Sequence, residues 1–149
     1  MYRLALALLV MSAFAAPARA ATPLNPPKNL GAVSGVVSVE LNKMEQKGQN
    51  CRAYLVLKNK SSVALRSLKL DLVMFDAQGV VARRLAIEAA PLNVGKTSLR
   101  VFDIPKQSCD KISRILLNDI MECRGPIEAR TDCLDLVKTS SRTNTPFIK

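Results

Sequence analysis

The sequence predicts an all-β protein built from about seven short strands. Two consecutive segments, residues 51–58 and 68–75, alternate apolar and polar side chains with a period of two. That period is typical of antiparallel strands that cover a core with one face. Turn sequences separate these segments from the other apolar runs, and no segment has the 3.6-residue period of an amphipathic helix. Together these observations predict an immunoglobulin-like antiparallel β-sandwich stabilised by disulfides.

The first three predicted strands have the clearest patterns. Residues 35–44 (GVVSVELNKM) form the first, and residues 46–50 (QKGQN) form the turn that follows it. The second and third are joined by NKSS, and a turn at residues 76–79 ends the third in glycine. Their core-facing side chains are Cys51, Ala53, Leu55 and Leu57 on the second strand, and Leu68, Leu70, Leu72 and Met74 on the third.

The fourth predicted strand, residues 80–88 (VVARRLAIE), departs from this alternation. If Val81, Leu85 and Ile87 point inward, Arg83 points inward as well. An inward charge is a known way to protect the edge of a sheet, so we expect an edge strand or a bulge here. As an alternative, the basic pair of Arg83 and Arg84 is a candidate site for an anion.

The last three predicted strands follow in order. Residues 96–104 (KTSLRVFDI) form the fifth, which Pro105 closes. Residues 112–122 (ISRILLNDIME) are apolar on both faces, as in a central strand, and a short helix is the main alternative. Residues 133–148 form the last strand, which we expect to be interrupted or bent near Thr139.

The beginning of the chain predicts export to the periplasm. Residues 1–20 read as a signal peptide, with Arg3 before a short apolar core and Ala18-Arg19-Ala20 as the cleavage motif, so that cleavage follows Ala20. The single arginine favours the general secretory route over the twin-arginine route, and the apolar stretch is too short to span a membrane. Residues 21–32 form an extended, proline-rich leader, and residues 33–149 form one sandwich domain.

The chain is strongly basic, with a formal net charge of +10, or +8 when Arg3 and Arg19 are removed with the signal peptide. Such a charge attracts lipid A phosphates, acidic phospholipids or an acidic partner protein. The basic residues are spread from Lys28 to Lys149 without a dense run, so solubility alone is the alternative explanation. With no tryptophan and few other aromatic residues, the chain offers little surface for base stacking, and we expect no nucleic-acid partner.

Four cysteines in a small exported chain predict two disulfides. If the strands alternate in direction, Cys51 and Cys109 lie at one end of the sandwich, and Cys123 and Cys133 lie at the other. The strand between Cys109 and Cys123 spans roughly 45 Å, whereas a disulfide allows about 6 Å between Cα atoms. The sequence therefore favours Cys51–Cys109 and Cys123–Cys133. A four-thiolate zinc site is disfavoured, because the chain has no C-x-x-C pair and the compartment is oxidising.

The sequence lacks the residues of common catalytic sites. It contains no histidine, which is the usual base for a serine or cysteine nucleophile and the commonest metal ligand. Methionine is a ligand for copper(I), but Met44, Met74 and Met121 are not clustered and Met74 lies on a core face, so packing is their expected role. We expect no metal, no cofactor and no enzymatic activity.

The segment KTSSRT, residues 138–143, is the best candidate for binding. Lys138, Ser140, Ser141 and Arg142 place two cations and hydroxyl donors close together, a group that can hold a phosphate or carboxylate with Arg142 as the bidentate partner. The alternative is an ordinary polar strand in which Arg142 pairs with a nearby acid.

Five segments carry a resemblance to a known family: CRAYLVLKN, LKLDLVMFDAQGVV, VFDI before Cys109, RILLND before Cys123, and SSRT. They resemble small exported proteins of alphaproteobacteria, often described as twin-arginine signal sequence domain proteins, over roughly residues 40–146. The strand layout is also loosely similar to FxLYD and other immunoglobulin-like accessory domains of bacterial envelopes. The resemblance implies a non-catalytic accessory protein that binds an envelope protein or complex. The alternative function is binding of anions, anionic lipid or lipopolysaccharide through the basic residues.

Overall fold

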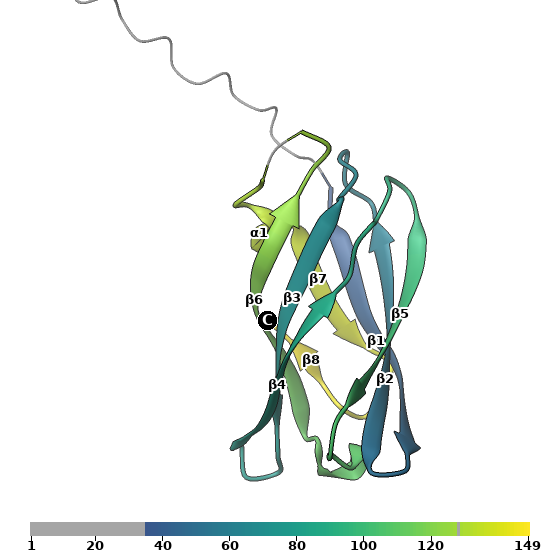
Figure 1. Ribbon diagram of the computed structural model, residues 1–149, viewed down its shortest axis with the longest axis vertical. Coiled ribbons are helices and arrows are strands. Elements are labelled where there is room, and N and C mark those ends of the chain that lie inside the picture. Colours follow the sequence, from purple (N-terminus) through teal and green to yellow (C-terminus); the bar gives the residue numbers. More distant parts are fainter. Residues whose placement is uncertain (1–34, 128) are drawn as a thin grey trace, which may run out of the picture. The chain divides into compact units, whose positions relative to one another are not determined.

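The computed structural model describes residues 35–127 and 129–149, which form a sandwich of two four-stranded sheets (Figure 1). The expected signal peptide and leader lie outside the described residues. The first sheet has the order β5 (Thr97–Ile104), β2 (Asn50–Asn59), β1 (Val37–Lys47), β7 (Val137–Ser141). The second sheet has the order β4 (Val81–Glu88), β3 (Ser67–Phe75), β6 (Arg114–Arg124), β8 (Phe147–Ile148).

The core lies between the sheets and is built from the alternating faces that the sequence predicts. The apolar sets on β2 and β3 are buried, with Leu55 1% and Leu70 0% exposed. Val37, Val39 and Leu41 on β1 continue the same core. The pattern of period two arises because successive side chains of a strand point to opposite faces of its sheet. The prediction of a disulfide-stabilised all-β sandwich is therefore confirmed.

The last segment differs from the single bent strand that we expected. It divides into the short helix α1 (Cys133–Leu136), then β7, then β8, so the described residues form eight strands. The break lies at residues 142–146 rather than near Thr139, because the Ser141 hydroxyl binds Thr143 and donates to the carbonyl oxygen of Thr145, which turns the chain. β7 runs parallel to β1 and β8 runs parallel to β6, so this turn carries the chain from one sheet to the other.

Two uncertain segments are settled by the sheet register. The residues expected to form a central strand or a helix form the strand β6, which lies between β3 and β8. β4 is both an edge strand and bulged, since the register passes from Met74–Arg83 to Phe75–Val81 and leaves Ala82 without a partner. The bulge turns Val81 to the outer face, where it is 57% exposed, so the inward position expected for Val81 is wrong.

Both disulfides join the cysteines that the strand directions favour. Cys51 at the start of β2 is bonded to Cys109 in the 3₁₀ helix η1 (Cys109–Lys111), with 4.8 Å between Cα atoms. Cys123 near the end of β6 is bonded to Cys133 in α1, with 6.4 Å between Cα atoms. The helices of the described residues include none that is long and apolar enough to cross a bilayer.

Candidate functional site

Arg83 and Arg84, expected as a basic pair, point to opposite faces of the second sheet. Arg84 forms a bidentate pair with Asp71 at 2.8 and 2.9 Å on the outer face. The inward Arg83 donates to the carbonyl oxygens of Pro105 and Lys106 and to that of Ala82. Both guanidinium groups therefore have partners within the chain, and the structure does not bring them together around one anion.

Asp71 is the carboxylate that holds Arg84 in place on the outer face. The carboxylate is on the outer face but only 2% exposed, because Arg84 and the Asn118 amide, at 2.6 Å, cover it. The hydrogen bond from Arg84 holds the pKa of Asp71 below its usual range, against the opposing effect of burial, and the bond from Asn118 lowers it further. The Asp71 carboxylate is therefore enclosed, whereas the Arg84 side chain is 63% exposed and binds Asp71 through Nε and Nη2.

The structure places three of the four KTSSRT candidates on one face. β7 pairs with β1 so that Lys138 lies beside Ser38 and Ser140 beside Glu40, on the outer face of the first sheet. Arg142 follows on that face, and its Nε donates to Glu40 at 2.9 Å. Ser141 points the other way and is engaged in the turn before β8. Arg142 thus has the acidic partner of the alternative interpretation, whereas Lys138 and Ser140 are exposed.

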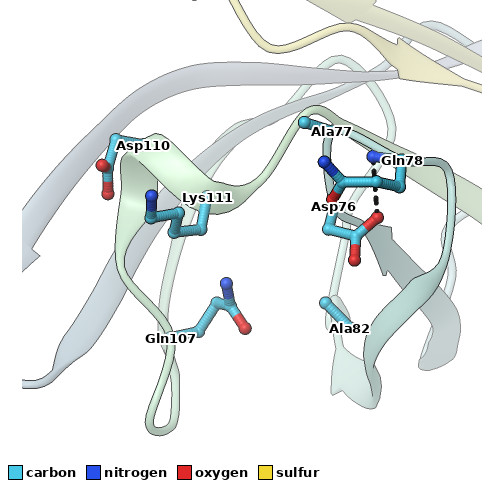
Figure 2. Close-up of a pocket in the computed structure, with 7 residues that line it drawn as sticks. All are labelled: Asp76, Ala77, Gln78, Ala82, Gln107, Asp110 and Lys111. Carbon is cyan, nitrogen blue, oxygen red and sulfur yellow. Dashed lines mark hydrogen bonds between the residues drawn. The ribbon is translucent and has the colours of Figure 1, made fainter.

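A polar pocket of about 430 Å³ lies between the β3–β4 turn and the segment around η1 (Figure 2). Its lining includes two carboxylates, an ammonium group and two amides, from Asp76, Asp110, Lys111, Gln78 and Gln107. One oxygen of Asp76 is occupied by the backbone N–H groups of Gln78 and Val80, which builds the expected turn. Among the described residues no group of three or more His, Cys, Asp or Glu side chains could hold a metal. The pocket shows no arrangement of nucleophile and base.

The surface with the clearest capacity for binding is apolar and lies on β5. Leu99 is 54% and Val101 47% exposed on the outer face of the first sheet. Directly opposite them on β2 are the half-buried Val56 and Tyr54. These four side chains, Leu99, Val101, Val56 and Tyr54, are called the β5 surface below. The sequence pattern does not predict the β5 surface, because both faces of TSLRVFDI mix apolar and polar residues. Which face lies outside is determined by how β5 pairs with β2.

The β5 surface borders a free sheet edge, because β5 pairs with β2 alone (Figure 1, right-hand side). Hydrogen bonds from Asn59 N to Lys96 O (3.0 Å) and from Gly95 N to Asn59 O (2.7 Å) fix which backbone groups face β2. Since these groups alternate along an antiparallel strand, those of Ser98, Arg100, Phe102 and Ile104 face β2. Those of Thr97, Leu99, Val101 and Asp103 face away from the sheet.

The other sheet edges are protected, whereas β5 is nearly open. β4 has a bulge and an inward arginine, β7 is 5 residues long and β8 is 2 residues long. β5 has 8 residues in continuous register with β2 and contains no proline. Its one protective residue is the inward-pointing Arg100, which donates to Leu99 O at 3.1 Å and to Pro91 O at 3.3 Å. Natural proteins seldom leave a regular apolar edge exposed without a use for it.

The charges around the β5 surface are unevenly distributed. At the end of the first sheet where β5 begins lie Lys58, Lys60 and Lys96, with Lys138 at the same level on the opposite edge strand β7. None of these four lysines forms an ion pair with any described residue. At the other end Asp103 is paired with Arg52 at 2.7 Å, and this hydrogen bond lowers the pKa of Asp103. The apolar β5 surface is therefore flanked by unpaired lysines at one end and by the Asp103–Arg52 pair at the other.

Fold and site together define a class: a disulfide-stabilised β-sandwich with an exposed apolar edge strand. No family model matches the chain, and no curated protein matches it. A similar solved structure is that of IrmA from Escherichia coli, with a TM-score of 0.54 and 12% sequence identity. The match covers 71% of this chain and 92% of IrmA. At this identity the likeness shows the fold alone.

Proposed function

We propose that the chain is a non-catalytic binding or accessory protein of the periplasm and that it binds a protein partner of the cell envelope. The observation that carries this proposal is the β5 surface, where exposed apolar side chains adjoin an open sheet edge. Contiguous exposed apolar side chains bordered by polar ones are typical of protein-binding sites. The resemblance to exported alphaproteobacterial proteins supports the same function, and two disulfides are consistent with an oxidising compartment.

The test is site-specific photo-crosslinking in the native host. A photoreactive residue at Leu99 should give one dominant protein adduct, and its yield should be insensitive to salt because the contact is apolar. The matched control is the same residue at Ser140, which is also exposed on an edge strand of the first sheet but lies outside the β5 surface. Equal adducts from both positions, or none from Leu99, would contradict partner binding at β5.

A second function, binding of anions or an anionic lipid surface, is favoured by the four lysines at the end of the first sheet where β5 begins. Their ammonium groups are free to contact phosphates, and each such contact near a charged membrane contributes about 1 kcal/mol. Flotation with vesicles of anionic phospholipid or lipopolysaccharide distinguishes this function. Binding that disappears as salt rises, and that weakens when Lys58 and Lys96 are changed to Gln, would favour it over a protein partner.

A further inference from the structure

We propose that β5 receives an extended segment of the partner as a fifth strand of the first sheet, and that this segment alternates apolar and acidic residues. The inference rests on the proposed partner binding and specifies its mode. Strand addition to an open edge is a recurrent way of recognising extended peptides, with affinity from backbone hydrogen bonds and specificity from alternate side chains.

The backbone of β5 provides the first part of the argument. Thr97, Leu99, Val101 and Asp103 direct their N–H and C=O groups away from β2. Only the carbonyl of Leu99 has a side-chain partner, the Arg100 guanidinium, and a carbonyl oxygen can accept a second bond. The uninterrupted register over the full strand keeps these groups evenly spaced, which a bulged edge such as β4 does not.

The outer side chains define one half of the partner's pattern. Directly opposite side chains on neighbouring strands lie about 4.5–5.5 Å apart at Cβ. Apolar residues of an added strand would therefore pack on Leu99 and Val101 and extend the row that Val56 and Tyr54 begin. Burial of these two exposed side chains supplies the hydrophobic contribution to binding.

Arg100 defines the other half of the pattern. It lies at the centre of the edge on the inward side, and two of its nitrogens donate to carbonyl oxygens, Leu99 O and Pro91 O. Its remaining N–H groups can bind an acidic side chain on the inward face of an added strand. Lys96 at the start of the strand and the basic net charge of the chain favour the same acidic chemistry.

The experiment uses a short capped peptide that alternates valine and glutamate, with a valine–lysine peptide as the charge control. Amide hydrogen exchange of the free protein should be fast at Leu99 and Val101 and slow at Arg100 and Phe102. The valine–glutamate peptide should slow exchange at Leu99 and Val101, and the valine–lysine peptide should bind at least about tenfold more weakly.

Proline substitution separates backbone pairing from side-chain contact. Val101→Pro removes an outward N–H without breaking a bond to β2, so the domain should keep its melting temperature while peptide binding falls at least about tenfold. Val101→Thr, which keeps the N–H, is the matched control. If Val101→Pro does not fold, Leu99→Pro tests the same point one pair along the edge.

Three results would overturn strand addition. One is the absence of protection at Leu99 and Val101 at about 1 mM peptide, a concentration that detects even weak binding. Another is equal binding of the two peptides. The third is protection that appears with rising protein concentration alone, which would mean that a second copy of the chain occupies the edge. A partner that still crosslinks at Leu99 in any of these cases leaves the proposed function intact and rejects only this mode.

Discussion

At the residue scale, the Asp71–Arg84–Asn118 cluster shows what a sequence pattern can and cannot reveal. The alternation of β3 correctly puts Asp71 on the outer face. Its burial was not predictable, because it depends on a shift in the β3–β6 register, where Asp71 opposes Asp119 and Leu72 opposes Leu117. Asn118 is the extra residue, and its amide reaches Asp71. Such a register shift is determined by the pairing of two distant segments, so the sequence of neither segment alone indicates it.

A pH-dependent loss of stability is expected at Asp71. Its folded pKa lies below the unfolded value of about 3.9, so its contribution is complete above that value and is lost as the pH falls through the folded pKa. Asp71→Asn should lower the free energy of unfolding by about 1.5–3 kcal/mol at pH 7. Urea denaturation of both proteins should show this difference shrinking below about pH 4. A difference that stays constant with pH would contradict the expectation.

Arg142→Gln is expected to be mild. Arg142 pairs with Glu40 on the surface, its side chain is 70% exposed, and such pairs contribute about 0–1 kcal/mol. The melting temperature should change little, and crosslinking from Leu99 should be unaffected. A large loss of partner or anion binding with unchanged stability would instead restore KTSSRT as a binding site.

At the element scale, strand positions follow from the sequence better than strand order does. The alternation on β2 and β3 and the inward charge on β4 predicted strands, core faces and an edge. The division of the last segment into β7 and β8 was not predicted, because hydroxyl hydrogen bonds around Ser141 end β7 where the apolar pattern shows no boundary. The β5 surface was also missed: its exposure depends on which strands become neighbours, which a local pattern does not contain.

Substitutions on the two faces of the sandwich test the alternation directly. Leu55→Asp or Leu70→Asp should unfold the domain, because each would place an unpaired carboxylate in the core. Lys58→Asp on the outer face should change stability by less than about 0.5 kcal/mol. Lys69→Asp is a less suitable control, although Lys69 points outward. Glu88 and Glu122 lie opposite it on the neighbouring strands, so the new carboxylate would face two others. Similar circular dichroism melting curves for Leu55→Asp and Lys58→Asp would refute the assigned faces.

At the scale of the whole molecule, the open side between β4 and β5 is held by two arginines that cross it in opposite directions. Arg83 on β4 donates to Pro105 and Lys106, just after β5. Arg100 on β5 donates to Pro91, just after β4. Each protects an edge of its own sheet and also ties that sheet to the opposite one.

The two disulfides should contribute unequally to stability. By the loop-entropy relation, the bond between Cys51 and Cys109, 58 residues apart, contributes about 4 kcal/mol, and that between Cys123 and Cys133, 10 residues apart, about 3 kcal/mol. Paired Cys→Ala variants measured by denaturant unfolding should reproduce this order. The reverse order would show that strain or residual structure in the unfolded chain outweighs loop entropy.

The placement of these bonds also determines what a protease could do to the protein. The turns and loops from residue 60 to residue 108 all lie inside the covalent ring closed by Cys51–Cys109, so one cut in any of them leaves both pieces attached. The ring of Cys123–Cys133 does the same for the loop between β6 and α1. Between the rings lie residues 110–122, most of them in β6, which is paired with β3 except where register shifts leave Asn118 and Met121 without a partner. A nick in a loop inside either ring therefore leaves the two pieces covalently joined, whereas a nick in the short segment 110–113 between the rings would separate them.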